Sequence, residues 1–174
     1  MEFAESKLNE AASKEDGAPS LSGDAAKRSV IDRMQTHAAL LEGARVLWVD
    51  DHPENNSPLV ELLREFGTVV DTPRSNAEAL ALLSGSRYDV VISDVARDNE
   101  GEDSDLKGVE FARAVFDHWG RRVLLFTARF DPARVPGASE ERRLELVSEV
   151  QQTVFARTNR ADELLHYMLD LLER

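Results

Sequence analysis

The chain contains no cysteine, which excludes disulfide bonds, thiolate nucleophiles and cysteine-based zinc sites. Its four histidines are scattered along the sequence and lack the spacing of a metal site. Oxygen is therefore the ligand atom that we expect for any metal ion.

Long apolar runs are also missing. No stretch approaches the roughly 20 apolar residues of a membrane-spanning helix, and the N-terminus lacks the basic and apolar regions of a secretion signal. We therefore expect a cytoplasmic protein with no membrane contact. Positive charge is scarce too, with 21 Lys and Arg against 33 Asp and Glu and a net charge of −12. Because DNA binding needs clustered cations, nucleic acid is not an expected partner.

The length of 174 residues suits one domain with an extension, and the composition changes near residue 43. Residues 1–28 carry too few large apolar side chains to offset the entropy of ordering, so we expect disorder there. Residues 29–42 show apolar side chains near helical spacing, which predicts one short amphipathic helix. That helix either packs on the domain, frays in solvent, or mediates dimerisation or partner docking. We assign 1–43 to this extension and 44–174 to the domain.

From residue 44 onward, apolar runs alternate with amphipathic segments. Strands are predicted at about 45–50, 68–71, 88–93, 122–127 and 153–157. Helices are predicted at about 57–66, 75–84, 107–118, 139–150 and 160–172. Since parallel strands need crossover helices, this alternation predicts an α/β fold: a doubly wound, five-stranded parallel sheet covered on both faces.

Several predicted strands end in residues that can carry chemistry. The first ends at Asp50 and Asp51, the third at Asp94, and the fourth at Thr127. In an open parallel sheet the carboxyl ends of the strands share one edge, where ligands bind. Two adjacent carboxylates raise each other's pKa unless a cation intervenes, so the pattern points to a site for a hard metal ion.

This constellation resembles the receiver domain of two-component response regulators, over about residues 44–173. The residues that carry the resemblance are the pair Asp50-Asp51, then Asp94 some 43 residues later, the pair Thr127-Ala128, and the cation Arg157 after the fifth strand. The resemblance implies a CheY-like, flavodoxin-like three-layer sandwich with strand order 2-1-3-4-5. It also implies that Asp94 is a phosphoacceptor.

The resemblance further implies bound Mg²⁺, held by Asp51, Asp94 and the backbone carbonyl of Ala96, with Asp50 orienting a bound water. Asp94 would be the nucleophile toward a phosphohistidine or a small acyl phosphate. Thr127 would donate its hydroxyl to a phosphoryl oxygen, and Arg157 would supply an ion pair.

The implied function is that of a signalling switch rather than an enzyme, with at most self-phosphorylation and autodephosphorylation. A histidine kinase or phosphotransfer protein would supply the phosphoryl group, and a downstream protein would read the signal. We expect a monomer or a weak homodimer.

Three departures from the family pattern keep an alternative open. Arg157 stands where the family has lysine, and a planar guanidinium does not reproduce the geometry of an ammonium. Val154 stands where an aromatic switch residue is common. The loop 95–106 is longer than usual and contains five acids, which suits either a mobile gate over the site or a solvated insertion.

The alternative function is therefore a degenerate receiver, which would act as a protein-interaction module without phosphorylation. A phosphatase related to the haloacid dehalogenases is less consistent with the sequence. Those enzymes place a DxD motif on the first strand, whereas this strand ends in Asp50-Asp51-His52-Pro53.

Overall fold

Five parallel strands form a single sheet in the computed structural model, which describes residues 2–12, 23–97, 106–127 and 130–174. The strand order is β2-β1-β3-β4-β5, which confirms the order implied by the resemblance to receiver domains. The strands are β1 (Arg45–Val49), β2 (Val69–Asp71), β3 (Val90–Ser93), β4 (Val123–Phe126) and β5 (Val154–Thr158).

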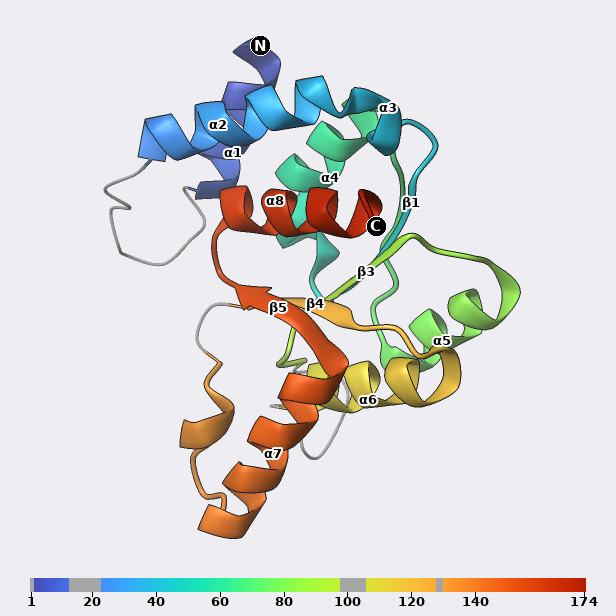
Figure 1. Ribbon diagram of the computed structural model, residues 1–174, viewed down its shortest axis with the longest axis vertical. Coiled ribbons are helices and arrows are strands. Elements are labelled where there is room, and N and C mark those ends of the chain that lie inside the picture. Colours follow the sequence, from blue (N-terminus) through green and yellow to red (C-terminus); the bar gives the residue numbers. More distant parts are fainter. Residues whose placement is uncertain (1, 13–22, 98–105, 128–129) are drawn as a thin grey trace.

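A helix precedes or follows each strand and covers one face of the sheet (Figure 1). All five helices predicted for residues 44–174 are present, within three residues of their expected ends. They are α4 (Ser57–Glu65), α5 (Asn76–Gly85), α6 (Lys107–Trp119), α7 (Glu140–Thr153) and α8 (Ala161–Leu172). Short 3-10 turns lie at Pro53–Asn56 and Pro132–Arg134.

Strand alternation divides the core into two halves. In β1, Val46 and Trp48 point to the face covered by α4 and α8, while Leu47 and Val49 point to the face covered by α5, α6 and α7. Trp48 is a buried packing residue, and its ring meets that of Phe126 edge-on, with the ring centroids 5.7 Å apart. Both faces of a parallel sheet are thereby buried, which explains why the strands read as continuous apolar runs.

Local signals fix several helix boundaries. The Ser75 hydroxyl accepts the Glu78 N–H at 3.2 Å, and the Glu78 carboxylate accepts the Arg74 N–H at 2.9 Å. This reciprocal arrangement is a capping box, which starts α5. Gly120 ends α6 with φ of 63°, a left-handed conformation that suits glycine.

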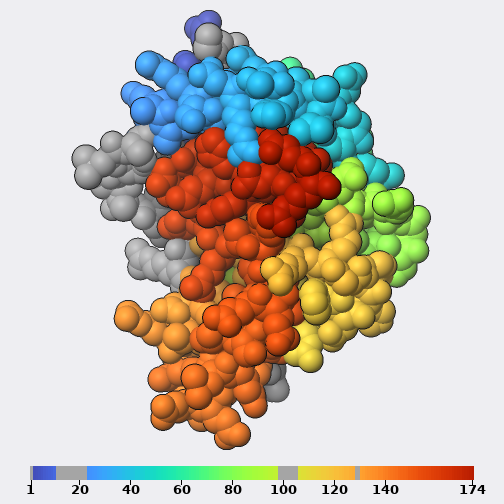
Figure 2. Space-filling view, viewed as in Figure 1, coloured from blue at the N-terminus to red at the C-terminus, as the bar shows by residue number. Residues whose placement is uncertain are grey.

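The N-terminal extension differs from the expectation of disorder in residues 1–28. Helix α1 spans Glu2–Ala12, and α2 spans Gly23–Thr36. The single helix expected over 29–42 is instead the second half of α2 followed by the short α3 (Ala38–Leu41). Residue 1 and residues 13–22 lie outside the described residues. In the view of Figure 2, residues of α2 lie directly against α8.

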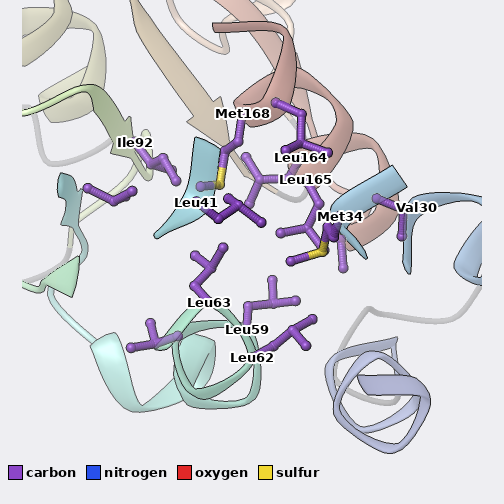
Figure 3. Close-up of a cluster of buried hydrophobic side chains, with 14 of the residues drawn as sticks. Val30, Met34, Leu41, Leu59, Leu62, Leu63, Ile92, Leu164, Leu165 and Met168 are labelled. Atoms are coloured by element: carbon purple, nitrogen blue, oxygen red, sulfur yellow. The ribbon is translucent and has the colours of Figure 1, made fainter. Parts of the chain in front are cut away.

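The extension is ordered because most of its large apolar side chains among the described residues enter one core, while Phe3 and Leu40 stay exposed. Ala4 and Leu8 of α1 are buried, and so are Val30, Ile31 and Met34 of α2. Figure 3 shows side chains of α2 and α3 converging on those of α4 and α8, with the labelled residues Val30, Met34, Leu41, Leu59, Leu62, Leu63, Leu164, Leu165 and Met168. Composition alone did not predict that α1 is ordered. Two apolar residues at i and i+4 are enough to dock a helix when α4 and α8 already provide an apolar surface.

Polar contacts add specificity to this interface. Arg33 of α2 pairs with Asp170 at 2.6 Å and with Glu173 at 2.9 Å, and its guanidinium also contacts the His166 carbonyl at 3.2 Å. On the other side, Lys7 of α1 pairs with Glu61 of α4 at 2.5 Å. The N-terminal helices therefore form an additional layer over α4 and α8. Within the described parts of the chain, no helix has the length and apolar character needed to cross a membrane.

The packing of α1 makes a stability prediction. Replacing Leu8, which is 1% exposed, with Ala should lower the free energy of unfolding by about 2 kcal/mol, because it removes buried methyl groups and leaves a cavity. Urea denaturation would measure this. Leu144→Ala is the matched control, since Leu144 is 67% exposed, and it should change stability little. Equal stability of Leu8→Ala and the parent protein would contradict the docked position of α1.

Candidate functional site

The sheet register brings the predicted site residues together at one edge. Val49 pairs with Ser93, so Asp50 and Asp94 leave neighbouring strands at the same level. The Asp94 N–H donates to the Val49 carbonyl at 3.0 Å. Ser93 in turn pairs with Leu125, which places Thr127 beside Asp94. The prediction that the strand-end residues converge is therefore confirmed for these three.

Asp50 is a buried carboxylate with two close hydrogen-bond donors. The backbone N–H of His52 lies 2.8 Å from one oxygen, and the side-chain amide of Asn56 lies 2.7 Å from the other. Burial nevertheless raises the pKa of Asp50, and the neighbouring charge of Asp51 raises it further. Asn56 is itself buried, so it acts as a fixed donor that the sequence reading did not identify.

Asp94 has a carboxyl group whose pKa is strongly raised. Burial, followed by the charge of Asp50, raises its pKa to about 6. Three groups work in the opposite direction: the Val95 N–H, which donates at 2.6 Å, the Thr127 hydroxyl, and the charge of Arg97. Asp94 is therefore an ionisable group whose negative charge is only partly compensated, which is the condition that favours a bound cation.

Asp51 completes the acidic group and is 4% exposed. Its carboxylate lies 3.6 Å from the His52 ring nitrogen Nε2, and its backbone carbonyl accepts a hydrogen bond from Arg74 at 3.1 Å. His52 itself is exposed, in agreement with its expected place in a turn. Ala96, expected to offer its carbonyl, lies exposed two residues after Asp94.

Arg97 is the functional candidate that sequence reasoning missed. Its side chain is fully buried, and its guanidinium contacts the Asn76 amide oxygen and the Ser93 hydroxyl. It also lies 3.4 Å from the Asp94 carbonyl oxygen and 5.7 Å from the centre of the Phe111 ring. The one available signal was a lone cation at the start of an otherwise acidic loop. The acidic segment 98–105, read as a gate or a solvated insertion, lies outside the described residues.

Arg157 lies in β5 and borders the same hollow as Thr127. Its guanidinium reaches the Phe130 carbonyl at 3.5 Å, and it lines an open hollow of about 480 Å³ together with Thr127 and Arg134. Val154 packs in the core on the α7 side, and Phe155 packs on the opposite face against Tyr167. Phe155 is thus a packing residue of the core.

Gly108 allows α6 to approach the Asp94 backbone. Its N–H donates to the Val95 carbonyl at 2.8 Å. A Cβ atom at this position would lie 2.1 Å from the Asp94 carbonyl oxygen and 2.6 Å from the Cα atom of Val95. Only glycine fits this contact, which fixes the backbone on which the Asp94 side chain stands.

The donor chemistry of this edge fits Mg²⁺. Asp50, Asp51 and Asp94 offer hard carboxylate oxygens, and their mutual repulsion would be relieved by a cation. They are not a preformed cage, because no three acidic or histidine side chains among the described residues are arranged as a metal site. Mg²⁺ commonly takes one or two carboxylates and keeps several waters, so a cage is not required.

Comparison with solved structures identifies the fold. The response regulator TrrA of Thermotoga maritima, solved in complex with Mg²⁺-BeF, is 24% identical over 74% of this chain and 98% of that protein, with a TM-score of 0.55. The chemotaxis response regulator CheY4 of Vibrio cholerae is 25% identical over 75% of this chain and 98% of its own, with a TM-score of 0.50.

The chain has the fold of response regulator receiver domains. A signal receiver domain from an HD domain-containing protein of Pseudomonas fluorescens agrees, at 19% identity over 76% of this chain and 88% of that one, with a TM-score of 0.57. No model of a protein family matches the sequence, and no curated protein matches it significantly. The similarity to receiver domains is thus found by comparing structures and not by comparing whole sequences.

The close approach at Gly108 makes a second prediction. Gly108→Ala should lower the free energy of unfolding by about 3 kcal/mol, because the new methyl group would collide with backbone atoms that cannot move independently. Gly85→Ala is the matched control, since nothing lies within 4 Å of its added Cβ. Thermal and urea denaturation of both variants would test this. A Gly108→Ala protein as stable as the control would disprove the contact.

The raised pKa of Asp94 makes a third prediction, about pH. The folded protein holds this proton more tightly than the unfolded chain, so its stability falls as the pH rises from 3.8 to about 6 and stays lowered above that. Asp94→Asn removes the ionisation and should stabilise the protein by up to about 3 kcal/mol at pH 8. At pH 4 most of that gain should vanish. An equal gain at both pH values would contradict the raised pKa.

Proposed function

We propose that the chain is a phosphoacceptor receiver domain of a two-component or phosphorelay system, with Asp94 as the residue that is phosphorylated. The observation that carries the proposal is the convergence of Asp50, Asp94 and Thr127 at the carboxyl edge of a sheet with the receiver fold. The fold by itself supports many functions. The proposal therefore depends on this site.

The chemistry follows from the surroundings of Asp94. A carboxylate oxygen of Asp94 attacks phosphorus, the bond from phosphorus to the donor's nitrogen or oxygen breaks, and the donor leaves with that electron pair. The raised pKa of about 6 leaves Asp94 ionised at neutral pH and close to its range of titration. Mg²⁺, bound through Asp51, Asp94 and the Ala96 carbonyl, would neutralise phosphoryl oxygens.

Thr127 supports a readout of this event. Its hydroxyl donates to the Asp94 carboxylate in the present state, and it can turn to a phosphoryl oxygen once Asp94 is modified. Arg157 borders the same hollow as Thr127, so it can approach the new negative charge by giving up its long contact to the Phe130 carbonyl. Together these movements would bias the β4 and β5 ends between two conformations.

The partners follow from the same proposal. A histidine kinase or phosphotransfer protein supplies the phosphoryl group, and a further protein recognises the altered surface. The protein then acts as a signalling switch rather than as an enzyme with turnover on a separate substrate. The strongly negative net charge of −12 makes direct nucleic-acid binding unfavourable.

A degenerate receiver is the second candidate, because specific contacts favour it. The Arg157 guanidinium contacts the Phe130 backbone carbonyl, and the buried Arg97 already supplies a positive charge to the acidic group. Such a domain would bind its partner whether or not Asp94 carried phosphate.

Mass spectrometry after incubation with acetyl phosphate and Mg²⁺ separates the two candidates. The phosphoacceptor proposal predicts an adduct of one phosphoryl group that is lost on heating in alkali and absent from Asp94→Asn. Asp89→Asn is the matched control, because Asp89 lies just before the opposite end of the same strand and its Oδ2 accepts the Arg45 N–H. That variant should still be modified. An adduct that persists in Asp94→Asn would disprove the assignment of Asp94, and its absence from the parent protein under several donors would favour the degenerate receiver.

A further inference from the structure

The environment of Arg97 is unusual for a charged side chain. The residue is fully buried, although burying a guanidinium is costly unless fixed partners receive it. Those partners come from separate elements: Asn76 at the start of α5, Ser93 in β3, and the Phe111 ring in α6. Three elements therefore cooperate to hold one positive charge behind Asp94.

The charge of Arg97 acts on the acidic residues of the site. It lowers the pKa of Asp50 as well as that of Asp94, and its Nη2 lies 3.4 Å from the Asp94 carbonyl oxygen. In a buried site with little water a fixed charge at this range is screened weakly.

We propose that Arg97 is a resident counter-ion of the acidic site, which neutralises part of the charge of Asp50 and Asp94 and thereby weakens the binding of Mg²⁺. The inference rests on the proposed function only in naming Mg²⁺ as the cation. Arg97 acts through the backbone and the charge of Asp94, so it is a positioning and tuning residue. Its guanidinium fixes the backbone of Asp94, and its charge competes with any cation that enters.

Two consequences follow for this chain. The site is stable without metal, because Arg97 offsets some of the repulsion between the carboxylates. Its affinity for Mg²⁺ is also lower than the same carboxylates would give alone, so that the site fills only at a higher Mg²⁺ concentration.

The test is a Mg²⁺ titration of the full chain at pH 8, followed by the amide NMR signals of Asp51 and Asp94. Arg97→Met keeps an apolar stem and removes the charge, and it should bind Mg²⁺ at least about tenfold more tightly. Arg97→Lys keeps the charge and should stay within about threefold of the parent protein. Arg74→Met is a control for a solvated cation, since Arg74 touches the Asp51 carbonyl but is exposed, and it should change the affinity far less than Arg97→Met does. Unchanged or weaker binding by folded Arg97→Met would overturn the proposal.

A second measurement decides the matter if Arg97→Met does not fold. The buried guanidinium should exchange its protons slowly, so its ¹⁵N signals can be followed in the parent protein while Mg²⁺ is added. Shifts of these signals with the same midpoint as those of Asp51 and Asp94 would support the counter-ion role, and unshifted signals at saturating Mg²⁺ would refute it. Phosphorylation by acetyl phosphate is measured separately. If Arg97→Met binds Mg²⁺ more tightly but no Asp94 adduct forms, the counter-ion role of Arg97 is supported and the proposed phosphoacceptor function is contradicted.

Discussion

The constraint on which this site depends is the burial of Asp50 and Asp94 next to each other at the end of two paired strands. Burial raises the pKa of both groups, and a neighbouring carboxylate adds to each shift, Asp51 to that of Asp50 and Asp50 to that of Asp94. Each source of relief is a local feature of the structure. The His52 and Val95 N–H groups, the Asn56 amide and the Thr127 hydroxyl all point toward these carboxylates. The surrounding loops and helix starts thus supply hydrogen-bond donors to carboxylates that the sheet has placed in a poorly solvated position.

The same constraint explains two residues, Gly108 and Arg97, that take no part in phosphoryl transfer. Gly108 brings the start of α6 against the Asp94 backbone, where any side chain would collide. Arg97 fills the space behind that backbone and returns part of the missing positive charge. A rigid backbone and a fixed counter-charge together keep Asp94 ionisable near neutral pH without unfolding the strand end.

The sequence was sufficient for the five-stranded parallel sheet because apolar runs alternate with amphipathic segments, and the resemblance to receiver domains supplied the strand order. Apolar runs ending in Asp50, Asp94 and Thr127 specified which ends meet, and crossover handedness left few topologies. The position of Arg97 could not be predicted in the same way. Whether an arginine in an acidic loop is buried depends on Asn76 and Phe111, which approach only after α5 and α6 have packed.

The N-terminal helices were missed for a related reason. Ala4 and Leu8 give too weak a pattern to predict a helix alone, yet they dock on a surface that α4 and α8 have already formed. Arg33 adds ion pairs to Asp170 and Glu173 near the C-terminus, a pairing that no local pattern reveals. Long-range partners, rather than local propensity, decide both cases.

The most direct test of the account is the structure of the protein with beryllofluoride and Mg²⁺, which together imitate a phosphorylated aspartate. The account predicts beryllium bonded to an oxygen of Asp94, the Thr127 hydroxyl turned from the Asp94 carboxylate to a fluorine, and Mg²⁺ beside Asp51. Beryllofluoride bound elsewhere, or an Asp94 that stays unmodified at saturating concentrations of both, would contradict the central claim that this edge of the sheet is a phosphoacceptor site.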